Sequence, residues 1–153
     1  MIGADRGRRL LWHGLFLFLL GLLTGLIIPH VSNPRMGLAA HMEGVMNGTF
    51  LAVLGLAWER MVLSERAGAA LFGLALFGTY ANWSGTLLGA VLGTNRLTPI
   101  AGVGRGGPAW AENVIAVGLI SLAVAMIAAV VIALWGLRGR STASRPRAHG
   151  TDS

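Results

Sequence analysis

Residues 114–137 read VIAVGLISLAVAMIAAVVIALWGL, an uncharged stretch with Ser121 as its only hydroxyl. A helix needs about 20 mostly apolar residues to cross a bilayer, so this stretch is long enough to do so. Three earlier stretches have a similar character, at 10–28, 36–58 and 67–93. The pattern predicts an all-α integral membrane protein whose four transmembrane helices form an antiparallel bundle.

The composition of the 153-residue chain agrees with this fold, because 54% of the residues are hydrophobic and only 12% are charged. A soluble domain carries about a quarter charged residues, so a water-soluble globule is excluded. The absence of cysteine excludes disulfide scaffolds, cysteine zinc sites and thiol nucleophiles. All 12 basic residues are arginines, and they gather at the ends of apolar stretches. That placement indicates membrane flanks and argues against a nucleic-acid partner.

The arginines also predict how the chain is organised across the membrane. Residues 1–9 form an N-terminal flank, 10–137 the transmembrane domain, and 138–153 a basic tail expected to be disordered. Arginine is concentrated in these two flanks and in the loop 59–66, so we expect both termini in the cytoplasm. A signal peptide is the alternative for the first stretch, but its apolar part exceeds the usual length of about 7–15 residues.

The second span carries the residues that are most costly inside a membrane, His41 and Glu43, together with Asn47. At about 100° per residue, Glu43 and Asn47 share one helix face and His41 points well away from both. Small residues surround His41 on its face, among them Gly44 and Gly48. They would let a neighbouring helix approach the backbone, or a planar cofactor whose metal takes the imidazole.

The third span contributes Asn82 and Thr86 to the same depth of the membrane. At ~1.5 Å per residue, Asn47 and Asn82 both lie roughly 16 Å from the non-cytoplasmic ends of their spans. Glu43 and Thr86 both lie roughly 10 Å from those ends. We therefore expect the polar side chains of the two spans to converge in one layer.

Glu43 is expected to be largely protonated in hydrocarbon unless it is paired, and it could then donate a proton to a leaving oxygen. The alternative is a structural hydrogen bond to Asn82 or Thr86. Tyr80 is a second candidate proton donor, although a tyrosine between helices commonly only packs and hydrogen-bonds. His13 lies near the end of its span, where we expect it to be solvated.

Three segments of the sequence resemble one enzyme family, the hydroxylaminobenzene mutases. They are LLWHG at 10–14, NPRMGLAAHMEGVMNG at 33–48 and GTYANW at 78–83. The family consists of small bacterial integral-membrane enzymes that convert hydroxylaminobenzene to 2-aminophenol. The resemblance implies an isomerase of aromatic compound degradation in the bacterial inner membrane, acting on an aromatic hydroxylamine.

A more distant resemblance is to the styrene oxide isomerases, four-helix membrane enzymes that bind haem b and form trimers. Their second helix has a histidine and an asparagine six apart followed by glycine, which His41, Asn47 and Gly48 match. The resemblance implies that His41 is the axial ligand of a haem b, with Gly44 and Gly48 beside it, and that the protein is a homo-oligomer. The sequence departs from these enzymes at Glu43, where they have a small residue, so epoxide isomerisation is the less expected activity.

Together these lines predict that the haem iron acts as a Lewis acid on the hydroxylamine oxygen. Glu43 and Tyr80 would supply the proton, and Asn47 and Asn82 would orient the N–OH group. Three alternatives stay open: a haem-dependent aryl epoxide isomerase, a non-catalytic haem carrier, and a transporter that uses Glu43 for proton coupling.

Overall fold

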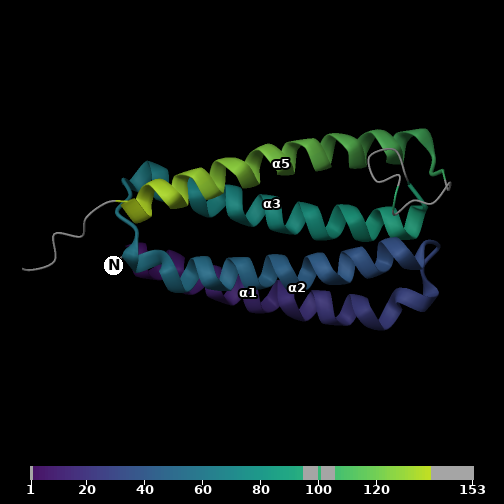
Figure 1. Ribbon diagram of the computed structural model, residues 1–153, viewed down its shortest axis with the longest axis horizontal. Helices are drawn as coiled ribbons and strands as arrows, with labels where there is room; N and C mark the ends of the chain where they lie inside the picture. Colours follow the sequence, from purple (N-terminus) through teal and green to yellow (C-terminus); the bar gives the residue numbers. More distant parts are fainter. Residues whose placement is uncertain (1, 95–99, 101–105, 139–153) are drawn as a thin grey trace, which may run out of the picture.

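The computed structural model describes residues 2–94, 100 and 106–138, and places four long α-helices in this part of the chain. They are α1 (Ile2–Ile27), α2 (Pro34–Ala57), α3 (Glu65–Leu92) and α5 (Ala109–Arg138). The helices lie lengthwise beside one another (Figure 1), with α1 packed on α2, α2 on α3 and α3 on α5. The end of α1 and the start of α2 meet at one end of the bundle, and α2 connects to α3 at the other (Figure 1). The predicted tail beyond Arg138 lies outside the described residues.

Local sequence signals fix where α2 and α3 begin and where α3 ends. The side chain of Asn33 caps α2 by accepting a hydrogen bond from the backbone N–H of Met36, and Pro34 opens the first turn. Ser64 caps α3 in the same way. Gly93 ends α3 with φ 73°, a left-handed conformation that glycine adopts without strain.

The contact between α1 and α2 depends on glycine, because the two backbones touch. A Cβ atom on Gly21 would lie 2.6 Å from the backbone nitrogen of Val45, and one on Gly44 would lie 2.5 Å from the Cα of Gly21. Gly14 and Gly48 meet in the same way one turn further along. Any larger residue at these positions would force the helices apart.

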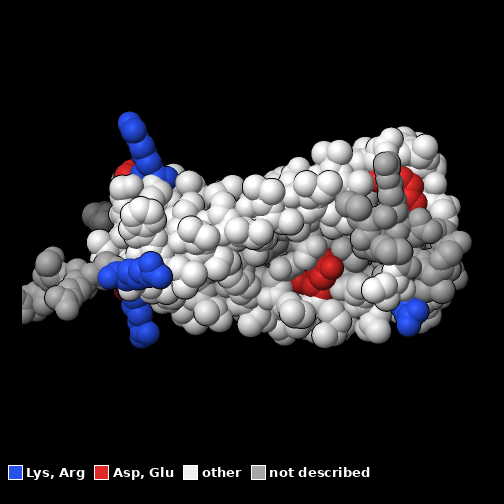
Figure 2. Space-filling view, turned by 45° about the horizontal axis from the view of Figure 1, so that its top comes forward, with Lys and Arg blue, Asp and Glu red and all other residues white. Residues whose placement is uncertain are grey.

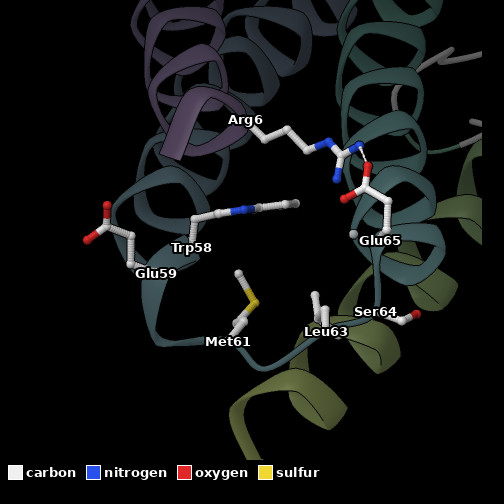
Figure 3. A pocket seen from close by; sticks show the side chains of 8 residues that line it. Arg6, Trp58, Glu59, Met61, Leu63, Ser64 and Glu65 are labelled. Carbon is white, nitrogen blue, oxygen red and sulfur yellow. Dashed lines mark hydrogen bonds and ion pairs between the residues drawn. The ribbon is translucent and has the colours of Figure 1, made fainter. Parts of the chain in front are cut away.

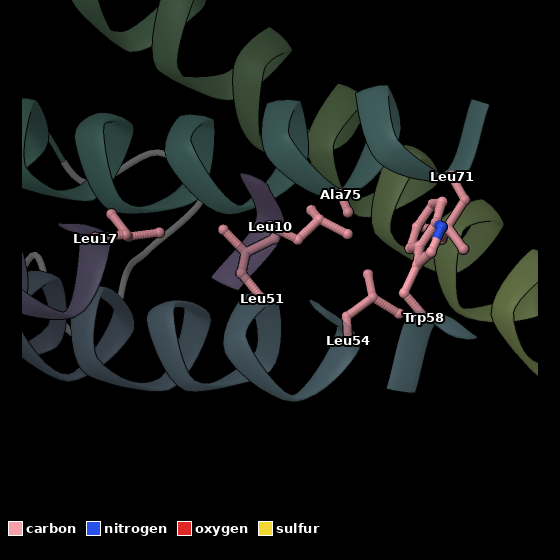
Figure 4. Packing of buried hydrophobic residues seen from close by; sticks show 8 residues of the cluster. Leu10, Leu17, Leu51, Leu54, Trp58, Leu71 and Ala75 are labelled. Atoms are coloured by element: carbon pink, nitrogen blue, oxygen red, sulfur yellow. The ribbon is translucent and has the colours of Figure 1, made fainter. Parts of the chain in front are cut away.

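The apolar core lies toward the end of the bundle that holds the start of α1 (Figure 4). Its buried residues come from α1, the second half of α2, the first half of α3 and α5: Leu10, Leu17, Leu51, Leu54, Leu71, Ala75 and Ala129, together with Trp58. This packing leaves the first half of α2 and the second half of α3, with their polar side chains, in the other part of the bundle.

Two of the described helices, Asp5–His30 and Ala109–Arg138, are long and apolar enough to cross a membrane. Large hydrophobic side chains cover the outside of α5, where Val117, Val124 and Ile127 are each about two-thirds exposed at 65%, 65% and 67%. Such a surface requires an apolar surrounding, which indicates a membrane protein. The helices α2 and α3 carry the polar residues described below.

Candidate functional site

His41 projects from α2 toward α1, where its Nδ1 lies 2.8 Å from the backbone oxygen of Gly21. A carbonyl oxygen can only accept, so Nδ1 carries the hydrogen and donates it. In the neutral ring the lone pair is then on Nε2. Among the described residues, the Gly21 oxygen is the hydrogen-bond partner of this imidazole. Nε2 therefore remains available to a ligand.

Gly44 and Gly48 lie in the contact between α1 and α2, and their predicted role beside a cofactor stays a prediction. A Cβ on Gly48 would lie 2.5 Å from the backbone nitrogen of Phe18, and Gly44 is enclosed by Gly21 and the ring of Trp83. No open groove exists at these two residues, since helix backbone fills the space. The structure therefore supports the helix-packing alternative for both glycines.

The opposite face of α2 carries two buried polar atoms without a hydrogen-bond partner, Oε2 of Glu43 and Nδ2 of Asn47. The side chain of Thr86 on α3 interacts with the Glu43 carboxyl, which confirms the depth match of these two residues. Asn82 is half-buried one turn before Thr86 on α3. Its predicted place in one layer with Asn47 stays a prediction.

The surface of the bundle is hollowed around an acidic side chain (Figure 2). In this view the arginine side chains lie at the two ends of the bundle, and the acidic side chain lies in the hollow between them. Within residues 2–94, 100 and 106–138, Glu43 is the acidic residue that lies away from every helix end. The unpartnered atoms of α2 thus lie in the middle of the bundle, where burying a carboxyl group in a membrane protein costs free energy.

The hydroxyl of Tyr80 bonds to α1, and its predicted role as a second proton donor stays a prediction. Its hydroxyl lies 3.1 Å from Nδ1 of His13 on α1 and 3.5 Å from the backbone oxygen of the same residue. The two rings meet edge to face. His13, expected to be solvated, is instead half-buried and partnered, so the pair connects α1 to α3.

A second connection between α1 and α3 was missed by sequence reasoning. The indole Nε1 of Trp83 donates a hydrogen bond of 3.1 Å to Oγ1 of Thr24. The Thr24 hydroxyl in turn donates to the backbone oxygen of Leu20. A buried threonine in an otherwise apolar first span was the available signal, because such a hydroxyl needs a partner.

A separate cavity of about 290 Å³ lies at the end of the bundle near the start of α1 and α3 (Figure 3). There the guanidinium of Arg6 forms an ion pair with Glu65, and the indole of Trp58 lies beneath it (Figure 3). Glu59 points away from this pair (Figure 3). Arg6 and Glu65 neutralise each other there, so this ion pair joins the start of α1 to the start of α3.

The described residues hold no group of three or more His, Asp or Glu side chains that could bind a metal ion. A bare metal ion therefore has no complete ligand set in this part of the chain. The single nitrogen that His41 presents suits a metal that arrives already bound in a macrocycle, as in haem. Its Nδ1–H bond to a carbonyl is also the arrangement that metal-bound histidines usually have.

The family model of styrene oxide isomerase matches residues 6–138. The chain belongs to this family. Among its curated relatives, hydroxylaminobenzene mutase HabB of Ectopseudomonas oleovorans is 49% identical over 98% of this chain and 89% of its own length. Hydroxylaminobenzene mutase HabA of the same organism is 45% identical over 81% of this chain and 93% of its own length. No solved structure matches.

The match to the styrene oxide isomerase family covers all four described helices and every candidate site residue. The face of α2 with the unpartnered atoms therefore lies within the segment that matches the family model. The two curated relatives share the name of a mutase, and that name directs the functional proposal.

Proposed function

We propose that this protein is a membrane mutase that isomerises hydroxylaminobenzene or a related arylhydroxylamine to the 2-aminophenol. Relatives of this name at 49% and 45% identity support the proposal. The observation that carries it is the pair of buried, unpartnered atoms on α2, Oε2 of Glu43 and Nδ2 of Asn47. Unpartnered buried polar atoms are rare, because each costs about 1–3 kcal/mol, so a ligand is the natural partner.

The N–OH group of an arylhydroxylamine complements these two atoms. Its oxygen can accept from a protonated Glu43 carboxyl and from the Asn47 amide, and its own hydrogens can be donated to a remaining lone pair of that carboxyl. Thr86 orients the carboxyl from α3, and Asn82 adds a second amide at a similar depth. The aryl ring, which has no polar group to satisfy, dissolves in the surrounding apolar side chains and lipid.

The isomerisation breaks the N–O bond, forms a C–O bond at the ortho carbon, and moves the ortho proton to nitrogen. No reductant or second substrate is required. Glu43 in its protonated form donates to the departing oxygen, and the resulting carboxylate takes a proton back from that oxygen after the C–O bond has formed, while the ortho proton passes to nitrogen. The amides of Asn47 and Asn82 hold the oxygen near the ring during the transfer.

A haem b held by Nε2 of His41 is part of the same proposal. When bound, it would supply a Lewis acid for the hydroxylamine oxygen. His41→Ala should lose both haem and turnover; full activity in this variant would contradict the role of His41. Absorbance of the purified protein in the Soret region measures the haem independently of the activity.

For the membrane arrangement we propose that all four helices span the bacterial inner membrane with both termini in the cytoplasm. The 24 residues of α2, the shortest of the four, extend about 36 Å at ~1.5 Å per residue, enough for the hydrocarbon core. Arginine in the flanks and in the loop between α2 and α3 supports this orientation. We also propose a homo-oligomer, a trimer, because the chain belongs to the family of the styrene oxide isomerases, which it resembles. Reporter fusions after Arg60 and after Arg138 should both give cytoplasmic signals.

A product assay tests the proposed activity. Membranes that contain the protein receive hydroxylaminobenzene without reductant or nucleotide, and the products are separated by chromatography. We expect stoichiometric 2-aminophenol, and none from membranes of the same host without the protein. Intact protein that makes no 2-aminophenol would overturn the proposal.

Epoxide isomerisation is the second candidate, because the matching family model describes styrene oxide isomerase. Styrene oxide given to the same membranes tests it. Glu43 is proposed to protonate the oxygen of an N–O bond, and an epoxide has no such bond. We therefore expect conversion of styrene oxide far below that of hydroxylaminobenzene. Faster conversion of the epoxide would reverse the order of the two candidates.

A further inference from the structure

The imidazole of His41 lies against two glycines of α1 that are one helical turn apart. Its Nδ1 is 2.8 Å from the backbone oxygen of Gly21. A Cβ atom on Gly25 would lie 2.9 Å from the same Nδ1 and 3.2 Å from the ring carbon Cε1. One glycine thus supplies the hydrogen-bond acceptor, and the other leaves the space that the ring occupies.

The backbone oxygen of Gly21 accepts two hydrogen bonds in this arrangement. Inside an α-helix it accepts from the N–H of residue 25, and its second lone pair is free for the Nδ1–H of His41. The imidazole must therefore approach close to the backbone at position 25. This explains why a side chain there is incompatible with the observed ring position.

A Cβ at position 25 would meet a side chain and not a backbone, so the imidazole is the part that can move. Movement of the ring would lengthen or break its bond to Gly21, and the tautomer would no longer be fixed. Gly14, Gly21, Gly44 and Gly48 differ in this respect, since their added Cβ atoms would meet helix backbone.

We propose that Gly21 and Gly25 are positioning residues for His41. The Gly21 carbonyl holds the imidazole in the Nδ1–H tautomer, and the bare backbone at Gly25 admits the ring, so that Nε2 presents its lone pair to a ligand. The inference extends the proposed function where that ligand is haem, but the tautomer itself does not depend on haem.

The test compares the wild-type chain with Gly25→Ala and with Gly37→Ala as a matched control. A Cβ on Gly37 would also lie 2.9 Å from its nearest neighbour, but that neighbour is a methyl group of Val31. Each full-length protein is labelled with ¹⁵N-histidine, produced without haem in a haem-deficient host, and studied by NMR in detergent at a pH where imidazole is neutral. His41→Gln identifies the His41 signals.

Wild type and Gly37→Ala should show a protonated Nδ1 and an unprotonated Nε2 for His41, and Gly25→Ala should show a mixture of tautomers. In haem-replete cells, Gly25→Ala should bind haem about 10–100-fold more weakly than Gly37→Ala, the usual effect of losing a partner that orients a ligand histidine. A protonated Nε2 in wild type, or unchanged His41 signals in Gly25→Ala, would overturn the proposal.

The wild-type spectrum tests the role of the Gly21 carbonyl even where Gly25→Ala fails to fold. A fixed Nδ1–H tautomer in a wild-type protein that binds no haem would support the positioning role and contradict the haem part of the proposed function. The two proposals can thus fail separately.

Discussion

Two sets of polar side chains inside the described part of the bundle differ in one property. The set between α1 and α3, Tyr80 with His13 and Trp83 with Thr24, is fully paired by hydrogen bonds of 3.1 Å. The set on α2, Glu43 and Asn47, leaves one buried atom of each residue without a partner. Paired groups hold helices together, whereas unpaired groups destabilise the free protein unless a ligand completes them. We propose that this difference separates structural residues from binding residues.

Glu43→Gln should have the largest effect on activity. The amide keeps the shape but cannot transfer a proton, so we expect turnover to fall by about 10²–10⁴-fold. Stability in detergent should stay the same or rise, since a buried ionisable group is removed. Formation of 2-aminophenol and thermal unfolding measure the two effects. Glu59→Gln, at an exposed residue, is the matched control and should change neither.

Asn47→Leu should lower activity by roughly 10–100-fold, because the substrate oxygen loses a buried donor. The loss should fall mainly on KM if the amide contributes only to binding, and on kcat if it also holds the oxygen during transfer. The unfolding temperature should not fall, since Nδ2 has no partner to lose. A clear loss of stability would show that Asn47 belongs to the structural set.

Tyr80→Phe should have the opposite profile, and the smallest effect on turnover. Removal of the hydroxyl leaves His13 without its partner and should cost about 1 kcal/mol of stability. Turnover should change by less than about threefold, because Tyr80 makes no contact with Glu43. A large loss of turnover with an unchanged unfolding temperature would instead indicate that Tyr80 takes part in catalysis.

The sequence predicted the position of the helices and part of the site. Spacing along α2 separated His41 from Glu43 and Asn47, because helix geometry depends only on residue number. Counting residues from the span ends predicted that Glu43 and Thr86 lie at the same depth, and in the structure their side chains interact. Both predictions rest on regular backbone geometry, which the sequence alone supplies.

The remaining contacts depend on which helix lies beside which, and helix spacing does not contain that information. A row of small residues on α2 can face either a helix or a cofactor. Only the position of α1 shows that Gly44 and Gly48 pack against a helix. In the same way, the side chain of Tyr80 contacts His13 on α1. The comparison of depths used only α2 and α3, so it could not predict a partner on α1.

The central claim is that the substrate completes the unpaired polar atoms of α2. Infrared difference spectra before and after addition of hydroxylaminobenzene, recorded at a temperature low enough to slow turnover, report on it directly. We predict that the carboxyl band of Glu43 shifts on addition, and that this shift is absent in Glu43→Gln. Identical difference spectra for the wild type and Glu43→Gln would contradict the claim.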